Sequence, residues 1–259
     1  MNTVLEAENL SKIYHRRGSL FAKAQHQVHA VKSLSLQLAR GETLAVVGES
    51  GSGKSTLARM LVGLEAPTSG VIKVMGEPQP QGNRRKASGR LIQYVFQDPQ
   101  ASLNPRHTIA EMLDAPLKHL CGYAAVDRQH RKLELLEAVN MPADALHGYP
   151  HEFSGGQAQR LAIARALAAE AQILVLDEPV SALDVSVQAQ VLLLLQQLKQ
   201  QFALSYLFIS HDLAVVEAIA DRVAVMYRGD LVECAASDVL FRAPVHDYTK
   251  SLLASAPRL

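Results

Sequence analysis

A glycine-rich segment that follows an apolar run constrains this chain more than any other feature. It matches the pattern G-x-x-x-x-G-K-[ST] without a mismatch, and a helical pattern over 55–64 follows it. Glycines let the backbone curl so that successive N–H groups converge on one anion, and the positive end of the next helix favours phosphate. This segment, the phosphate loop, predicts an α/β nucleotide-binding domain. Its residues are Gly48, Glu49, Ser50, Gly51, Ser52, Gly53, Lys54, Ser55 and Thr56.

Two side chains of the loop have the chemistry that nucleotide binding requires. Lys54 would place a full charge between the β- and γ-phosphates, and the Ser55 hydroxyl could ligate Mg²⁺. The competing interpretation as a dinucleotide fingerprint is weak, because Thr56 stands where that pattern has its third glycine. An intact Gly-Lys-Ser in this context also argues against a turn without a ligand.

A second element carries acidic residues to the end of an apolar run. Residues 173–176 are all apolar, and Asp177 and Glu178 follow them directly. In α/β proteins ligands bind at the carboxyl ends of the strands. Asp177 would therefore hold Mg²⁺ through a water, and Glu178 would lie nearer the γ-phosphate. Taken alone, the pair is more often a helix cap or a loop acid; together with the phosphate loop, the catalytic interpretation is favoured.

The rest of the chain shows three kinds of pattern. Partial alternation over 5–10 and 31–38 predicts half-exposed antiparallel strands. Short apolar runs predict buried strands, and longer periodic patterns predict helices between them. From about 108 to 169 strand runs vanish, which predicts a helical insertion broken at Gly122, Pro142, Gly148 and Pro150. The basic stretch 83–86 is interpreted as a solvated loop. The buried strands are expected at 43–47, 91–96, 173–176, 204–209 and 223–226, and the helices at 185–202 and 213–220.

Composition excludes several classes of protein. Among 259 residues, 26 basic side chains nearly cancel 25 acidic ones, so no chain-wide nucleic-acid partner is expected. No apolar run approaches the ~20 residues that span a bilayer, and the first residues do not resemble a secretory signal. Cys121 and Cys234 lack the spacing of a zinc site or a disulfide framework.

A third motif makes a family visible. Phe153, Ser154, Gly155, Gly156 and Gln157 precede Asp177. With Gln97, the turn 181–184, His211 and the phosphate loop, they resemble the ATP-binding cassette (ABC) family over essentially the whole chain. The resemblance implies a single ABC ATPase domain over 1–259 with a P-loop NTPase (RecA-like) core. An N-terminal antiparallel β subdomain and this core would take up 1–97 and 170–235, an inserted α-helical subdomain 98–169, and a C-terminal extension 236–259.

The resemblance also implies roles for single residues. Tyr14 would stack on adenine, and Gln97 would contact Mg²⁺ and the attacking water. Glu178 would be the general base, and His211 would bind the γ-phosphate and steady the water. Asp184 would lie at a dimer contact. Each has a structural alternative, such as sheet packing for Tyr14, a turn for Gln97 and a strand end for His211.

In the family two ATPase domains pair head to tail, and the segment 154–157 of one closes over the γ-phosphate held by the other. The helix that begins near Gln157 would point its positive end at that anion, and Ser154 would donate a hydrogen bond. Without a partner, the segment would be a helix N-cap with two flexible glycines.

Segments 96–99, 102–106, 178–190 and 247–253 are similar to the dipeptide/oligopeptide/nickel importer branch, and the chain most resembles the second ATPase subunit of bacterial dipeptide importers. This implies ATP and Mg²⁺, a different but homologous ATPase partner, two permease subunits and, indirectly, an external binding protein. It also implies a peripheral location at the cytoplasmic face of the bacterial inner membrane. A nickel importer ATPase, a soluble ABC ATPase not coupled to transport and a nucleotide sensor with a dead site are the alternatives.

Overall fold

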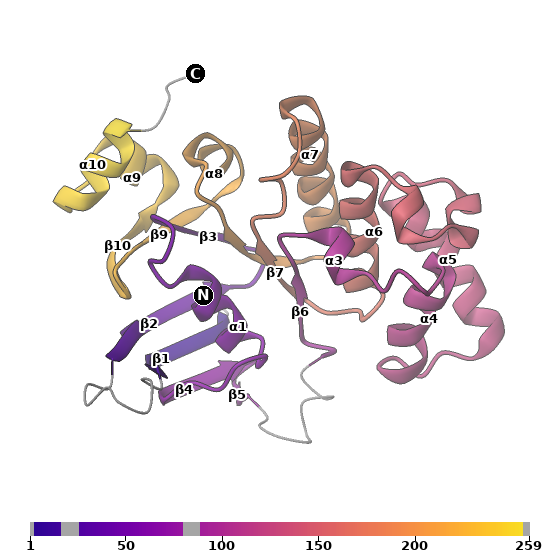
Figure 1. Ribbon diagram of the computed structural model, residues 1–259, viewed down its shortest axis with the longest axis horizontal. Coiled ribbons are helices and arrows are strands. Elements are labelled where there is room, and N and C mark those ends of the chain that lie inside the picture. The colour runs from indigo at the N-terminus through magenta and orange to yellow at the C-terminus, as the bar shows by residue number, and fades with distance from the viewer. Residues whose placement is uncertain (1–2, 17–25, 80–88, 256–259) are drawn as a thin grey trace. The chain divides into compact units, whose positions relative to one another are not determined.

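The computed structural model describes residues 3–16, 26–79 and 89–255, and the elements are labelled in Figure 1. The described residues within 1–81 and 207–259 form one compact unit, called unit 1, and those within 82–206 form another, called unit 2. The basic stretch 83–86 lies outside the described residues. The limits expected for core, helical subdomain and C-terminal extension stay a prediction.

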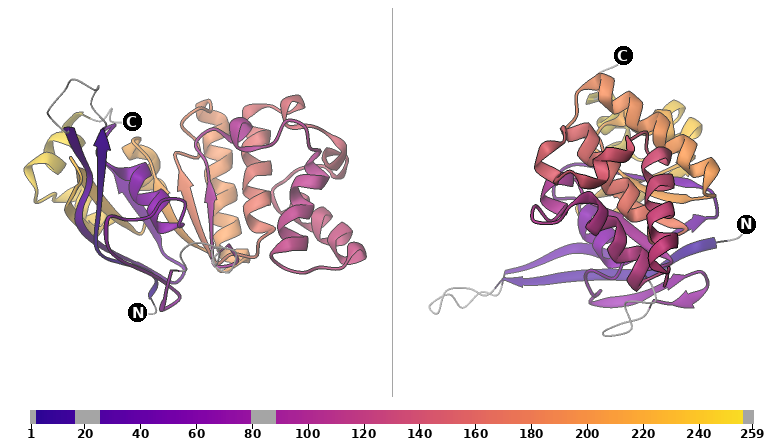
Figure 2. Two further views of the ribbon diagram at one scale, coloured as in Figure 1. Left: turned by 60° about the horizontal axis from the view of Figure 1, so that its bottom comes forward. Right: turned by 90° about the vertical axis from the view of Figure 1, so that its right-hand side faces the viewer.

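Unit 1 begins with an antiparallel sheet. Strands β1 (Thr3–Arg16) and β2 (His26–Ala39) pair along most of their length, and β4 (Ser69–Val74) pairs with the other edge of β1 (Figure 2). Leu34, Leu36 and Leu38 are buried while the residues between them are exposed, as expected for a sheet with one packed face. The predicted antiparallel strands are confirmed and are longer than predicted. The two-residue strand β5 (Glu77–Pro78) completes the sheet.

A second sheet in unit 1 carries the phosphate loop. Strand β3 (Thr43–Val47) pairs in parallel with β9 (Arg222–Tyr227), which pairs antiparallel with β10 (Asp230–Ala236). β3 also neighbours β8 (Ser205–Ile209), which crosses the boundary of the two units. Every residue of β3 is buried, which explains why all of them except Thr43 are apolar.

The helices of unit 1 follow this sheet in sequence. Helix α1 (Lys54–Leu61) starts immediately after the phosphate loop and ends three residues before the predicted limit, because Gly63 adopts a φ of 76°. Buried side chains from β3, β9, α8 (Leu213–Ile219) and α9 (Ser237–Arg242) form one apolar cluster, against which Tyr248, Leu252 and Leu253 pack. Helix α10 (Asp247–Ser255) follows α9.

Unit 2 combines parallel strands with the predicted helical insertion. Strand β6 (Ile92–Val95) pairs in parallel with β7 (Ile173–Asp177). Gly122, with a φ of 76°, lies between α4 (Ile109–His119) and α5 (Ala125–Ala138), where the sequence predicts a break. The helices are α3 (Pro99–Ser102), α4 (Ile109–His119), α5 (Ala125–Ala138), α6 (Gly155–Leu167) and α7 (Val185–Gln201), with 3₁₀ turns at Ala143–His147 and Pro150–Glu152.

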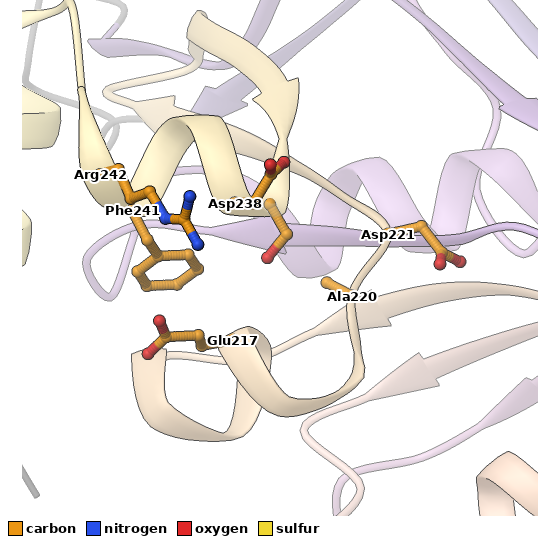
Figure 3. A pocket seen from close by; sticks show the side chains of 7 residues that line it. Glu217, Ala220, Asp221, Asp238, Phe241 and Arg242 are labelled. Carbon is orange, nitrogen blue, oxygen red and sulfur yellow. The ribbon is translucent and has the colours of Figure 1, made fainter.

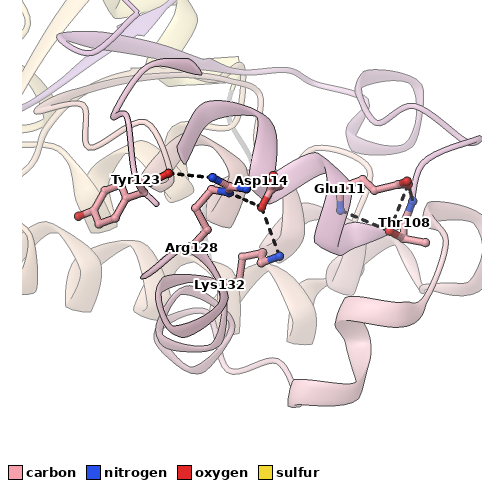
Figure 4. A network of polar contacts seen from close by, with 6 residues as sticks. All are labelled: Thr108, Glu111, Asp114, Tyr123, Arg128 and Lys132. Carbon is pink, nitrogen blue, oxygen red and sulfur yellow. Dashed lines mark hydrogen bonds and ion pairs between the residues drawn. The ribbon is translucent and has the colours of Figure 1, made fainter. Parts of the chain in front are cut away.

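Polar contacts hold the first two long helices of the insertion together (Figure 4). Asp114 of α4 accepts from Arg128 Nε at 2.8 Å and from Lys132 Nζ at 3.4 Å, both on α5. Burial alone would raise the pKa of Asp114, but the Arg128 hydrogen bond and the Lys132 charge outweigh it and lower the pKa. A capping box between Thr108 and Glu111 fixes the start of α4.

Helix α6 is buried around most of its circumference. Its 13 residues include buried Leu161, Ile163 and Leu167, together with the small residues Ala158, Ala162, Ala164 and Ala166. Within the described ranges, no helix combines the length and apolar character that crossing a membrane requires.

Candidate functional site

Two glycines of the phosphate loop adopt the positive φ angles that a curled backbone needs, and a further constraint acts on both. Gly48 has a φ of 144°, and a Cβ added there would lie 2.1 Å from the carbonyl oxygen of Met226. Gly53 has a φ of 107°, and its Cβ would lie 2.1 Å from the carbonyl oxygen of Ala30. Both positions therefore exclude a side chain because the protein's own backbone is too close. Only Gly51, whose Cβ would meet nothing within 4 Å, opens onto free space.

Lys54 is held over its own loop. Its Nζ donates to the carbonyl oxygens of Gly48 at 2.7 Å and Glu49 at 2.9 Å, and the residue is only 6% exposed. The Ser52 N–H also donates to Glu49 O, at 3.1 Å. The buried Ser52 Oγ has no hydrogen-bond partner among the described residues. A cationic amine, a helix start and a buried hydroxyl with no partner thus meet in one loop, as a phosphate site requires.

Two other predicted residues of unit 1 lie near this loop. Tyr14 lies on β1, close enough to Glu65 and to Thr56 of the loop for both side chains to affect its pKa. Burial, followed by the Glu65 hydrogen bond, raises the pKa of Tyr14. His211 is exposed and follows β8, where the Ser210 N–H donates to Val46 O at 3.4 Å. The ends of β8 and β3 are therefore neighbours, and His211 and the phosphate loop lie at the same edge of the sheet.

The two predicted carboxylates lie in unit 2. Asp177 ends β7, is 5% exposed, and accepts a hydrogen bond from the hydroxyl of Tyr94 on the adjacent strand β6. Glu178 adopts a φ of 48°, in the left-handed region that costs a non-glycine residue free energy. Gln97 Nε2 donates to Glu178 Oε2 at 2.9 Å. The structure therefore brings Gln97 and Glu178 together. Sequence reasoning missed Tyr94, whose only signal was an aromatic side chain within the apolar run 91–96.

The segment Ser154–Gln157 forms the start of α6. Ser154 Oγ accepts from the Gln157 N–H at 3.4 Å, and Gln157 Oε1 accepts from the Ser154 N–H at 3.0 Å. Because of this capping box the helix begins at Gly155, two residues before Gln157. A Cβ on Gly156 would lie 2.5 Å from Val187 Cγ1 of α7, so this glycine is needed where α6 packs on α7.

Asp184 caps the neighbouring helix α7. Its Oδ1 accepts from the Ser186 hydroxyl at 2.7 Å and from the Val187 N–H at 3.0 Å. The hydrogen bond from Ser186, followed by that from Val187, lowers the pKa of Asp184. Its predicted place at a dimer contact stays a prediction.

One cleft in unit 2 joins three of these segments. Its volume is about 400 Å³, and its walls come from the turn after Gln97, the first turns of α6 and the turn after Glu178. Gln159, 1% exposed, lines it with a buried Nε2 that has no partner among the described residues.

A second cleft, of about 360 Å³, lies in unit 1 between α8 and α9 (Figure 3). Acidic Glu217, Asp221 and Asp238 line it with Phe241 and Arg242. Asp221 Oδ2 accepts the Thr43 N–H at 2.7 Å, so part of this charge supports the fold. None of the predicted site residues lines this cleft.

Asp177 and Ser55, two of the predicted metal ligands, carry oxygen donors. No group of three or more His, Cys, Asp or Glu side chains in the described part of the chain could hold an ion. Mg²⁺ bound with ATP takes one or two carboxylates and completes its shell with phosphate oxygens and waters. The buried Asp177 carboxylate and the Ser55 hydroxyl are donors of this type.

Comparisons with known proteins decide the family. Residues 31–181 match the family model described as "ABC transporter". The chain is 49% identical to the dipeptide transport ATP-binding protein DppF of Haemophilus influenzae over 99% of this chain and 79% of that protein. The chain belongs to the ABC transporter family. The oligopeptide transport ATP-binding protein AppF of Bacillus subtilis is 45% identical over 98% of this chain and 78% of that protein.

Solved structures agree with this membership. A dimeric, post-hydrolysis structure of the ATP-binding cassette MJ0796 with ADP and Pi has a TM-score of 0.78 and 27% identity, covering 90% of this chain and 98% of that one. The predicted P-loop NTPase fold is confirmed. As a member of the ABC transporter family, the chain binds ATP and is an ATPase whose hydrolysis is coupled to transport.

Proposed function

We propose that this chain is the ATP-hydrolysing subunit of a peptide importer, with ATP held by residues 48–56. The names of the relatives support the peptide cargo, since DppF is a dipeptide and AppF an oligopeptide transport protein. Relatives called peptide import ATP-binding proteins reach 50% identity over 234 residues.

The phosphate loop is proposed to bind through its backbone and two side chains. Gly53 caps α1 without a side-chain oxygen, so the loop relies on an anion at this helix end. Lys54 would exchange the carbonyls of Gly48 and Glu49 for phosphate oxygens, which gain more from its charge. Tyr14 would pack against adenine. Mg²⁺, held by Ser55 and Gln97 and through water by Asp177, would neutralise charge on the β- and γ-phosphates.

The hydrogen bond between Gln97 and Glu178 is the observation that carries the catalytic proposal. Glu178 follows a buried strand, and its backbone is in the left-handed conformation. Because the Gln97 amide also holds its carboxylate, that carboxylate is oriented before the substrate binds. Glu178 would accept a proton from the attacking water on a carboxylate oxygen, while Gln97 keeps that carboxylate in place. His211 would steady the water and the γ-phosphate, because an imidazole can donate a hydrogen bond to either.

The pairing with a second ATPase subunit is proposed from segment 154–157. Ser154 through Gln157 would close over the γ-phosphate bound by the partner's loop, and Asp184 would lie at the contact between the subunits. Dimeric cassettes among the structural neighbours support this pairing. The cleft beside Gln97 is a suitable groove for a short cytoplasmic helix of a permease subunit at the inner membrane, because its lining is mostly apolar.

Glu178→Gln tests the assigned base. The amide keeps the shape but cannot take the proton, so hydrolysis by the assembled transporter should fall by about 10²–10⁴-fold while ATP binding remains. Phosphate release and nucleotide binding are measured side by side. Glu77→Gln, an exposed change on β5, is the matched control and should hydrolyse like wild type. Undiminished hydrolysis by Glu178→Gln would remove Glu178 from the mechanism.

Reconstitution tests the cargo. The chain is placed in vesicles with its sister ATPase and the neighbouring permeases, and binding proteins loaded with peptide or with nickel are compared. Peptide-loaded binding protein should stimulate hydrolysis. Stimulation by nickel alone would overturn the peptide proposal, and a chain that never fractionates with membranes when these partners are co-expressed would favour the soluble class.

A further inference from the structure

A tyrosine far along the sequence contacts the phosphate loop. Tyr248 of α10 accepts a hydrogen bond on its hydroxyl from the N–H of Glu49, at 3.1 Å across 199 positions of sequence. The carbonyl of Glu49 is occupied as well, because it accepts from Lys54 Nζ and from the Ser52 N–H. The backbone of Glu49 is therefore held on its N–H by Tyr248 and on its carbonyl by the loop's own residues.

Tyr248 is fixed in place by its surroundings. Its ring centroid lies 4.1 Å from that of Tyr227, the last residue of β9, and the carbonyl of the preceding Met226 abuts Gly48. Tyr248 also packs against the apolar cluster that includes Val47, the residue before the loop. A ring held on two sides presents its hydroxyl at a defined point.

The start of α10 is also anchored. The Glu233 carboxylate on β10 accepts from the Val245 N–H at 2.9 Å and from the His246 N–H at 3.0 Å. Thr249, next to Tyr248, is fully buried. These contacts connect α10 to the sheet that carries the phosphate loop, so the Tyr248 hydroxyl does not depend on a freely moving segment.

We propose that Tyr248 is a positioning residue for ATP binding. By accepting the hydrogen bond from the Glu49 N–H, Tyr248 fixes the position of the Glu49 carbonyl. This carbonyl accepts from the Lys54 amine, so Tyr248 also fixes the position of that amine before ATP binds. The inference rests on the proposed role of the phosphate loop. Tyr248 acts through Glu49 and touches neither ATP nor the attacking water, so it controls affinity and leaves the chemical step unchanged.

The test removes only the hydroxyl. Tyr248→Phe keeps the ring against Tyr227, whereas Tyr227→Phe removes a neighbouring hydroxyl for which no hydrogen bond to the loop is found among the described residues. With the full chain, amide hydrogen exchange at Glu49 is measured without nucleotide, and Kd is measured by titration with MgATP. Lys54→Ala serves as the control for the site.

Tyr248→Phe should speed exchange at Glu49 and raise the Kd for MgATP about three- to tenfold, the effect of losing one hydrogen bond. In the assembled transporter KM should rise likewise with kcat unchanged. Tyr227→Phe should match wild type in all three measurements. The melting temperature of each variant identifies general unfolding, which would lower kcat as well as raise Kd.

Unchanged Glu49 exchange and unchanged Kd in Tyr248→Phe would overturn the inference, as would a fall in kcat at constant KM. Failure of the proposed function has a different signature. Wild type would then not bind MgATP, or Lys54→Ala would bind it equally well. In that case the proposed effect of Tyr248 on affinity would be refuted together with the proposed function. Amide hydrogen exchange at Glu49 would still show whether Tyr248 holds the loop.

Discussion

Two glycine-rich segments of this chain lead into helices, and the N-caps of these two helices differ. The phosphate loop passes through Gly53, which caps α1 in a left-handed conformation and brings no side-chain oxygen. The segment before α6 ends in Ser154, which is extended and forms a capping box with Gln157. One helix start lacks a side-chain cap, and the other supplies its own.

The difference separates a ligand site from a structural cap. A helix end with a glycine cap gains from an anion that accepts hydrogen bonds from its first N–H groups. A helix end with a complete capping box is already stable. We therefore expect the phosphate loop to need its nucleotide, and the start of α6 to be ordered whether or not a partner's nucleotide faces it.

The largest expected effect comes from replacing one glycine in each of the two segments with alanine. Gly53→Ala would force a Cβ to within 2.1 Å of a backbone oxygen at a φ of 107°, so it should cost about 3 kcal/mol or more. In Gly155→Ala the Cβ would make an ordinary 3.4 Å contact with Leu183, so the change should stay within about 1 kcal/mol. Thermal unfolding measures both. Equal melting temperatures would show that the phosphate loop is no more constrained than the start of α6.

A medium effect separates the cap of α6 from its proposed ligand. Ser154→Ala should lower the free energy of unfolding by about 1 kcal/mol, because the N-cap acceptor is lost. Ser154→Asp should restore that stability, since Asp caps as well as Ser, yet it should impair hydrolysis by placing a carboxylate against the partner's γ-phosphate. Denaturant unfolding and ATPase assays of the assembled transporter are compared. An active Ser154→Asp transporter would mean that this residue serves the helix alone.

The smallest effect concerns the third cap, Asp184 on α7, which differs from Ser154 in carrying a charge. Its hydrogen bonds lower its pKa below the ordinary 3.8, so the unfolded chain binds this proton more readily. The stabilisation is complete above pH 3.8 and is lost as pH falls through the folded pKa. Wild type should therefore have a higher melting temperature than Asp184→Asn near neutral pH, and this gap between the two melting temperatures should shrink as the pH falls below 3.8. A gap that does not change with pH would contradict the cap assignment.

Much of the fold could be predicted because its signals are local. β3, β7 and β8 are buried along their whole length and are apolar except for one terminal residue each, and β2 alternates because one face is exposed. β4 was missed because its first three residues are exposed and carry no periodic signal. β10, half-buried along most of its length, was missed for a similar reason.

The sequence predicted which residues belong to the candidate site better than it predicted the contacts that these residues make. Motif spacing pointed to Gln97 and Glu178, whose hydrogen bond the structure supplies. It did not indicate that the phosphate-loop glycines avoid Met226 and Ala30, because those residues lie far away in sequence. The hydrogen bond from Tyr94 to Asp177 depends on strand pairing in the same way.

The burial of α6 limits how this protein can vary. Wherever a helix is enclosed by its neighbours and lined with alanines, each added methylene must displace packed atoms. Substitutions at Ala158, Ala162 or Ala164 should therefore be rejected long before changes on the exposed face of α5 are. Sequence differences among chains of this type should therefore lie outside α6. A mutational scan should show that substitutions are poorly tolerated along most of this helix.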